Sequence, residues 1–100
     1  MKTYRGDRTI DGIEVTVDGQ PLDPRIDLLA LSQNGFEWSY EGAEPAQLAL
    51  ALLAAHTGND VRAKVEHLAF MRDVVANFGN EWEMTSADID EALAAMRPTG

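Results

Sequence analysis

Alternation of apolar and polar residues marks the first part of the chain. Residues 13–17 (IEVTV) alternate with a period of two and are rich in β-branched side chains, which is typical of a half-buried strand. An Asp-Gly turn dipeptide stands on either side of this segment. We therefore predict a strand here, with residues 3–5 as its partner. Pro21 and Pro24 prevent a long regular strand after it.

Two further segments repeat the alternation. Residues 36–40 (FEWSY) place Phe36, Trp38 and Tyr40 on one side of an extended chain. Because aromatic residues favour strands, we predict a strand whose three aromatic side chains face the core. Residues 81–84 (EWEM) form a shorter extended piece of the same kind.

A helix that is apolar on all sides is predicted over residues 46–56. Pro45 stands at its first position, where the missing N–H of proline costs nothing. Gly58 is a natural stop at the other end. Since leucine and alanine occupy every face of this helix, we expect it to be buried.

Two amphipathic helices follow. Asn59 or Asp60 caps the first, over residues 60–78, and a capping box at residues 85–88 (TSAD) begins the second, which Pro98 closes. The first has an apolar face at helical spacing, made of Val61, Val65, Leu68, Ala69, Arg72, Val75 and Ala76 and widened by Phe70, Met71, Val74 and Phe78. In the second, the same spacing is followed by Ile89, Ala92, Leu93 and Met96.

In chain order these elements predict an α+β fold. It consists of a small antiparallel sheet of three to four short strands packed against three helices, in the order β-β-β-α-α-β-α. One hundred residues is the size of one domain, and no repeat or linker interrupts the pattern. We therefore expect residues 1–100 to form a single domain.

Charge adds a strong acidic bias to this picture. Seventeen acids oppose eight bases, for a net charge of −9, and the excess is spread over both halves of the chain. Such a surface repels nucleic acid, so we expect no direct nucleic-acid binding and favour a protein partner with a basic surface. The absence of cysteine excludes disulfides and thiol chemistry. With no signal peptide and no apolar run of membrane length, we expect a cytoplasmic protein without membrane contact.

Three segments carry a resemblance to a known family. They are Tyr4-Arg5-Gly6, then Val15-x-Val17-Asp18-Gly19-x-Pro21-Leu22, and finally Phe36-x-Trp38-x-Tyr40-x-Gly42-x-x-Pro45-Ala46-Gln47-Leu48-Ala49. Together they resemble domain-of-unknown-function family 6166, small proteins of bacteria, archaea and their phages. The family usually has glycine where this chain has Ser39. The resemblance implies a prokaryotic or mobile-element origin, and it brings no activity, cofactor or catalytic residue with it.

Motifs for catalysis and cofactor binding are missing from the sequence. His56 and His67 lack the paired spacing of metal ligands, and no serine lies in a Gly-x-Ser-x-Gly elbow. No glycine-rich phosphate loop is present. The aromatic residues at 36–40 have acidic neighbours, unlike the aromatic residues that stack bases. We therefore expect a protein that is not an enzyme, with no catalytic residue, cofactor or metal.

Carboxylates remain as the candidate functional groups. We predict an acidic interaction surface made of Glu37, Glu41, Glu44, Glu81, Glu83, Asp88, Asp90 and Glu91. A structural interpretation competes for the last three, because acids near a helix N-terminus gain about 0.3–1 kcal/mol each from its dipole. The favoured hypothesis is a small, non-enzymatic protein-binding protein. One form of it is an inhibitor of a host nucleic-acid-handling or defence system, in which carboxylates imitate DNA phosphates.

Two other functions stay open. A ligand-binding or enzymatic domain with a cryptic pocket requires a concave site with clustered histidine, arginine and carboxylate groups. A homo-oligomeric accessory module requires an exposed apolar face on the helix of residues 60–78. The sequence leaves the oligomeric state undetermined.

Overall fold

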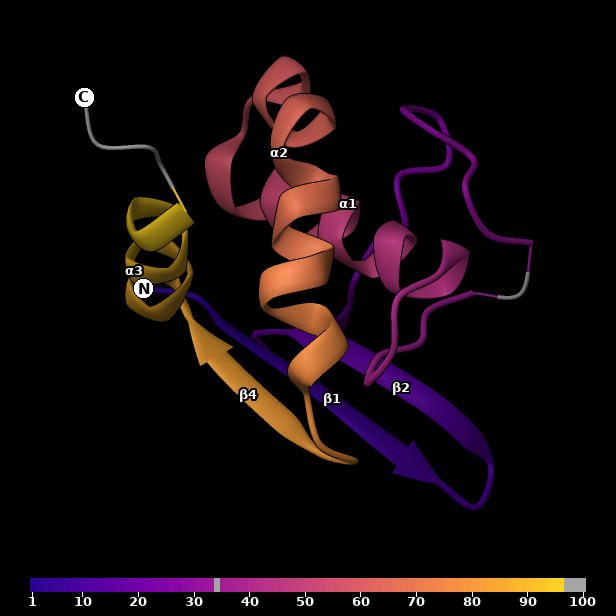
Figure 1. The fold of residues 1–100 in the computed structure, drawn as a ribbon. Helices are drawn as coiled ribbons and strands as arrows, with labels where there is room; N and C mark the ends of the chain where they lie inside the picture. The colour runs from indigo at the N-terminus through magenta and orange to yellow at the C-terminus, as the bar shows by residue number, and fades with distance from the viewer. Residues whose placement is uncertain (34, 97–100) are drawn as a thin grey trace.

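A computed structural model describes residues 1–33 and 35–96. It contains a β-sheet and a layer of helices packed against one face of that sheet (Figure 1). The strands are β1 (Thr3–Thr9), β2 (Gly12–Val17), β3 (Gln20–Pro21) and β4 (Trp82–Thr85). The helices are α1 (Ala43–Thr57), α2 (Asp60–Asp73), the short 3₁₀ helix η1 (Val75–Asn77) and α3 (Ser86–Met96). The α+β class and the order of strands and helices are those predicted from the sequence.

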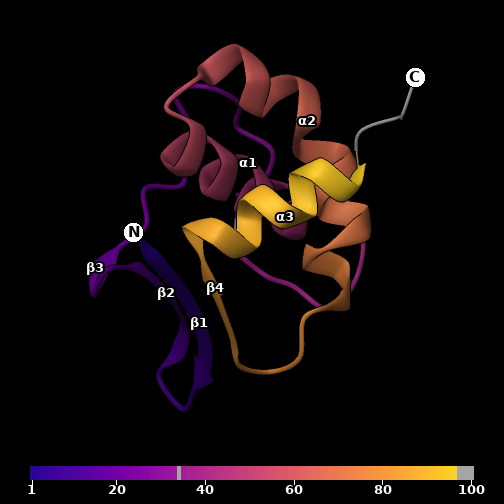
Figure 2. The same ribbon diagram turned by 90° about the vertical axis from the view of Figure 1, so that its left-hand side faces the viewer.

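The sheet is antiparallel throughout, with strand order β3-β2-β1-β4. β1 and β2 form the hairpin predicted from the alternating pattern. The C-terminal β4 then pairs with the other edge of β1 and leads directly into α3 (Figure 2). The start of the chain is held at this junction, because Ser86 N–H donates to the Lys2 carbonyl at 2.9 Å.

The strand predicted at residues 36–40 is wrong, and β3 takes its place in the order. Ser39 has a φ of +79°, in the left-handed region that favours glycine, so the extended run breaks there. Its backbone N–H donates to the Val75 carbonyl, in η1, and Arg8 donates to the Trp38 carbonyl. These backbone groups are therefore satisfied outside the sheet. Trp38 is fully buried as predicted, whereas Tyr40 is 43% exposed.

α1 is the centre of the core, as its composition predicts. Every residue from 45 to 54 is buried, and Gly58 ends the helix in the left-handed conformation with φ +63°. The helix begins at Ala43, so Pro45 is its third residue rather than its first. This change costs no hydrogen bond, since none of the first four N–H groups of a helix has a partner within it.

α2 buries only part of the face that was predicted: Phe70 and Met71 are buried, but its N-terminal half is turned differently. Val61 and Val65 are 71% and 75% exposed, and Leu68 is 49% exposed. The buried residues are Ala63, His67, Phe70 and Met71. The apolar arc of this helix is wide, and the small side chain of Ala63 lies on the face that packs against the rest of the core. The helix also ends at Asp73, and η1 follows it where the sequence predicts a continuous helix.

Helix starts agree with the predicted capping residues. The Asn59 side chain accepts a hydrogen bond from Arg62 N–H at 3.1 Å. At α3, Thr85 N–H donates to Asp88 Oδ2 at 2.9 Å, and Asp88 N–H donates to Thr85 Oγ1 at 3.2 Å. These reciprocal bonds are the capping box expected at residues 85–88.

An aromatic cluster joins the sheet to the helices. Trp38 and Trp82 meet edge to face at 5.8 Å, and Phe78 stacks on Trp82 at 4.5 Å. Gly6 faces Trp82 across the β1–β4 pair, and a Cβ at Gly6 would lie 2.2 Å from the indole Nε1. Only glycine leaves room for this packing, which explains the glycine at position 6 of the Tyr4-Arg5-Gly6 segment.

Candidate functional site

The face of the sheet that points away from the helices is uncovered and carries charged side chains. Strand alternation turns Tyr4, Gly6 and Val15 toward the core, where they are buried. The same alternation places their neighbours on the outside. These outward residues are Arg5 and Asp7 of β1, Glu14 and Thr16 of β2, and Glu83 of β4. Glu81, just before β4, adds a further exposed carboxylate.

Two shallow hollows lie side by side on this face. One, of about 360 Å³, is lined by Arg5, Asp7, Glu14, Thr16 and Gly19. The other, of about 270 Å³, is lined by Arg5, Asp7, Glu81, Trp82 and Glu83. Both contain Arg5 and Asp7, so they form one continuous surface across three strands. We call its carboxylates Asp7, Glu14, Glu81 and Glu83, together with Arg5, the acidic sheet face.

Its electrostatics are unbalanced. Arg5 Nε lies 3.2 Å from Glu83 Oε1, and both side chains are more than half exposed, so this ion pair is weak. Asp7 stands directly opposite Glu14 in the β1–β2 register. Like charges placed directly across two strands destabilise a sheet. The face therefore holds four carboxylates against one guanidinium, with two of the carboxylates opposed to each other.

Of the eight carboxylates predicted as an interaction surface, Glu81 and Glu83 lie on this face. The structure places Glu37 and Glu41 in the segment that leads into α1, and Glu44 in the first turn of that helix. Glu37 is half-buried and pairs with Arg8, whose Nη2 lies 2.6 Å from Glu37 Oε1. Glu41 is exposed, and Glu44 Oε1 lies 3.4 Å from the Tyr40 hydroxyl. Partial burial raises the pKa of Tyr40, and the charge of Glu44 adds to the effect.

The remaining three predicted carboxylates belong to α3. Asp88 takes part in the capping box at the start of α3. This is the structural interpretation that competes with a functional role for this residue. Asp90 Oδ1 lies 2.6 Å from His56 Nε2, at the last turn of α1. Glu91 is exposed. The eight residues thus divide into three groups on different elements.

Sequence reasoning missed Arg5, Asp7 and Glu14. The signal was present, since residues 13–17 alternate and Glu14 falls on the polar side of that strand. The opposition of Asp7 to Glu14 could not be read in this way, because it depends on the register between two strands.

Arg8 forms a polar cluster at the opposite side of the sheet. Its guanidinium lies 4.8 Å from the centre of the Trp38 ring and donates to the Trp38 carbonyl at 2.8 Å. Nη1 donates to Asn80 Oδ1 at 2.7 Å. Ser39 Oγ donates to the Phe78 carbonyl at 2.6 Å, which holds the left-handed residue in place. These bonds join β1, residues 37–39 and the segment before β4, and they give the cluster a structural role.

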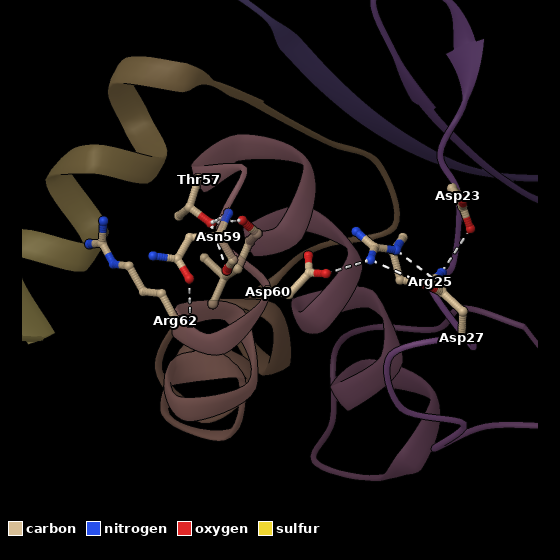
Figure 3. Close-up of polar contacts among 8 residues, drawn as sticks. Asp23, Arg25, Asp27, Thr57, Asn59, Asp60 and Arg62 are labelled. Atoms are coloured by element: carbon tan, nitrogen blue, oxygen red, sulfur yellow. Dashed lines mark hydrogen bonds and ion pairs between the residues drawn. The ribbon is translucent and has the colours of Figure 1, made fainter.

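A second polar cluster joins the loop before α1 to the start of α2 (Figure 3). Arg25 Nε donates to Asp27 Oδ1 at 3.1 Å, and Nη2 donates to Asp60 Oδ2 at 3.1 Å. Hydrogen bonds to Asp27 and then Asp60 raise the pKa of Arg25. The bond from Arg25 lowers the pKa of Asp27. Because its donors already serve carboxylates, we interpret Arg25 as a tether between two segments.

Both histidines are held by neighbouring groups. His56 contacts Asp90, as described above, and the Nδ1 of the buried His67 donates to the Lys64 carbonyl at 2.7 Å. Within residues 1–33 and 35–96, no group of three or more His, Asp or Glu side chains is arranged to hold a metal ion. No helix in this part of the chain is long and apolar enough to cross a membrane.

Comparison with known proteins gives one match. A family model described as a family of unknown function (DUF6166) matches residues 4–95. No curated protein and no solved structure matches the chain. The match spans all of the strands and helices apart from the first residue of β1 and the last residue of α3.

Proposed function

This chain belongs to the family of unknown function DUF6166, and from that premise we propose that it is a non-enzymatic binding protein whose acidic sheet face takes a basic surface of another protein. The buried residues of the segments behind the family resemblance serve packing. Gly6 accommodates Trp82, Trp38 lies in the core, and α1 is buried. We therefore assign the function to the surface of the protein, not to these buried residues.

The observation that carries the proposal is the opposition of Asp7 and Glu14 on an uncovered face. A directly opposed pair of like charges costs a fraction of a kcal/mol to about 1 kcal/mol relative to a neutral pair. Arg5 is next to both acids but is already paired with Glu83. A guanidinium or ammonium group of a partner would relieve this repulsion. The opposed pair therefore destabilises the free protein and favours binding of a basic surface.

The narrower form of the proposal concerns the kind of partner. Nucleic-acid-handling proteins present arginine and lysine groups to rows of phosphates. Carboxylates spread over three adjacent strands offer the same sign of charge on a rigid frame. We therefore place the partner among basic nucleic-acid-handling or defence proteins of a prokaryotic host, which this chain would inhibit by occupying their phosphate-binding surface.

A ligand-binding or enzymatic role has weaker support. The two hollows are open and lined by carboxylates, Arg5 and Thr16, while His56 and His67 lie on α1 and α2. Ligand pockets are usually concave, largely apolar and have a few convergent polar groups. The described hollows do not have this character.

The test compares two variants of equal net charge. The face variant carries Asp7→Asn, Glu14→Gln and Glu81→Gln, and the control variant carries Asp11→Asn, Glu41→Gln and Glu91→Gln. Each removes three negative charges from exposed or half-exposed positions. Wild type and both variants are immobilised and exposed to a prokaryotic host lysate over a range of salt concentrations, and retained proteins are identified by mass spectrometry.

We expect wild type and the control variant to retain the same basic nucleic-acid-handling protein, with retention weakened by salt and by added duplex DNA. The face variant should lose it by at least about tenfold in affinity, because each charge contact at a partly desolvated interface contributes on the order of 1 kcal/mol. Equal loss in both variants would reduce the effect to net charge. Retention that changes neither with salt nor with the face substitutions would refute the proposal.

A further inference from the structure

α2 displays an apolar stripe that no part of residues 1–33 and 35–96 covers. Val61, Val65 and Leu68 belong to the wider face that the sequence predicted as buried, and these three are exposed. Their neighbours Ala63 and His67 are buried instead. α2 also buries Phe70 and Met71, so the two valines and the leucine form a second apolar arc that is turned outward. Such an arc is typical of an interaction surface.

The spacing of this stripe is that of a two-helix seam. Val61, Val65 and Leu68 are separated by four and then three residues, which is the alternation of core positions in a coiled coil. Arg72 follows after four more residues and continues the same line along the helix. The stripe thus covers two turns of helix and ends in a cation.

Charge distinguishes α2 from the rest of the chain. The chain carries −9, but α2 has three acids (Asp60, Glu66, Asp73) and three bases (Arg62, Lys64, Arg72), so its own net charge is zero. Two copies of an acidic protein repel each other over most of their surface. A neutral helix with an apolar stripe is the face at which that repulsion is smallest.

From these observations we propose that a second copy of this chain docks on the α2 stripe, with the two α2 helices antiparallel and a two-fold axis near Val65. This inference is independent of the acidic sheet face, which lies on the other side of the sheet and stays uncovered in the pair. The dimer would present two such faces.

The antiparallel direction follows from the ends of the stripe. In that arrangement Arg72 of one copy lies near Asp60 of the other, and the two-fold axis repeats the contact. Arg72 is exposed and has no ion pair among residues 1–33 and 35–96. The Asp60 side chain is about half exposed although its Oδ2 accepts from Arg25 Nη2, so Arg72 of the other copy would join this ion pair. A parallel pair would instead place Arg72 against Arg72. Helix dipoles also favour the antiparallel pair, since unlike ends then meet.

An acidic helix of another protein is the competing occupant. It too could offer apolar residues to the stripe and a carboxylate to Arg72. The second copy is favoured because α2 supplies both requirements by itself, with an apolar seam of matching length and Asp60 at the matching end. A contact of one helix against one helix is smaller than the roughly 1,600 Å² of a stable interface, so we expect a dissociation constant of about 10 µM to 1 mM.

The first experiment is sedimentation equilibrium between about 10 µM and 1 mM protein, a range chosen to span the expected dissociation constant. The wild-type mass should rise toward that of a dimer. Val65→Glu should weaken association at least about tenfold, because a carboxylate would be buried next to its own symmetry mate. The matched control is Ile10→Glu, since Ile10 is a fully exposed apolar residue at the β1–β2 turn and the change in charge is the same. Circular dichroism verifies that both variants fold.

The second experiment uses the absence of cysteine in the chain. Val65→Cys should form a disulfide with its own copy on mild oxidation. Val61→Cys and Leu68→Cys should link to each other when mixed, and much less to themselves. Self-linking of all three variants would indicate a parallel pair and overturn the proposed geometry. A monomer at every concentration, or equal linking by Ile10→Cys, would overturn the dimer itself and leave the stripe to a foreign helix.

Discussion

Tyr4 shows how a single buried polar atom affects the fold. The side chain is fully buried near the start of β1, and its hydroxyl has no hydrogen-bond partner within the described residues. A buried hydroxyl without a partner costs about 1–3 kcal/mol relative to one in water. Burial raises the pKa of Tyr4, and the negative charge of Asp18 raises it further.

We predict that Tyr4→Phe raises the free energy of unfolding by about 1 kcal/mol, because it removes the unpaired hydroxyl and keeps the ring. The raised pKa means that the folded state favours neutral tyrosine. The stability that comes from this raised pKa is fully present below the ordinary tyrosine pKa of about 10. It is lost as the pH rises through the higher pKa of the folded state. Urea unfolding from pH 7 to pH 11 should therefore show a smaller alkaline loss in the variant.

The control for this prediction is Tyr40→Phe. Tyr40 is partly exposed and its hydroxyl donates to Glu44 at a long 3.4 Å, so its loss should change stability by less than about 0.5 kcal/mol at pH 7. A clear loss of stability in Tyr4→Phe at pH 7 would contradict the interpretation and mean that the hydroxyl has a partner in solution.

At the scale of elements, one side chain of α1 organises the loop that precedes it. Gln47 is 1% exposed, yet all of its bonds go to the backbone of residues 24–32. Its Oε1 accepts from Leu31 and Ser32 N–H at 2.8 and 3.1 Å. Its Nε2 donates to the Pro24 and Leu29 carbonyls at 2.6 and 3.0 Å. The long connection between β3 and α1 thus gains fixed backbone partners without forming a strand.

We predict that Gln47→Leu destabilises the protein by about 3 kcal/mol, because it leaves four partly buried backbone groups without their partners. Amide hydrogen exchange should accelerate most at Leu31 and Ser32, which donate to Gln47. The matched control is Gln33→Leu, an exposed glutamine in the same loop, which should change stability by less than about 0.5 kcal/mol. Unchanged exchange at residues 31 and 32 in Gln47→Leu would contradict this assignment.

At the scale of the whole molecule, net charge opposes compactness. The chain has seventeen acids and eight bases, so its charges repel one another. Folding brings these charges closer together, and added salt screens the repulsion. Four of the six ion pairs in the described residues have at least one well-exposed partner, and such pairs contribute little individually. Repulsion should therefore outweigh their loss when salt is added.

We predict that the urea midpoint of the wild-type protein rises as sodium chloride is increased from about 0.01 M to 1 M, where the screening length falls from roughly 30 Å to 3 Å. Glu14→Gln should raise the free energy of unfolding at low salt by about 0.2–1 kcal/mol, because it ends the opposition to Asp7, and should respond less to salt. Glu41→Gln makes the same change in charge on an exposed loop and should stabilise less. Equal effects of the two substitutions would mean that net charge, not the opposed pair, is responsible.

Sequence patterns predicted the local structure of this chain correctly where the pattern spans only a few neighbouring residues. The β1–β2 hairpin, the buried α1, the cap of α2 and the capping box of α3 could all be predicted, because alternation, composition and capping act over one or two turns. The exposed carboxylates Glu81 and Glu83 were predicted as well. Glu14 could have been found from the same alternation, whereas Asp7 lies among polar residues that do not alternate.

What the sequence by itself determined is the set of elements and their order; what the tertiary structure decided is which surfaces meet. Residues 36–40 alternate like a strand, but only Trp38 is fully buried, Phe36 is partly buried, and the left-handed Ser39 breaks the run. The apolar arc of α2 is wide enough to pack in more than one orientation, and its contacts with the core turned Val61 and Val65 outward. The strand register likewise placed Asp7 against Glu14. Each outcome depends on contacts between residues far apart in the chain, which periodicity cannot specify.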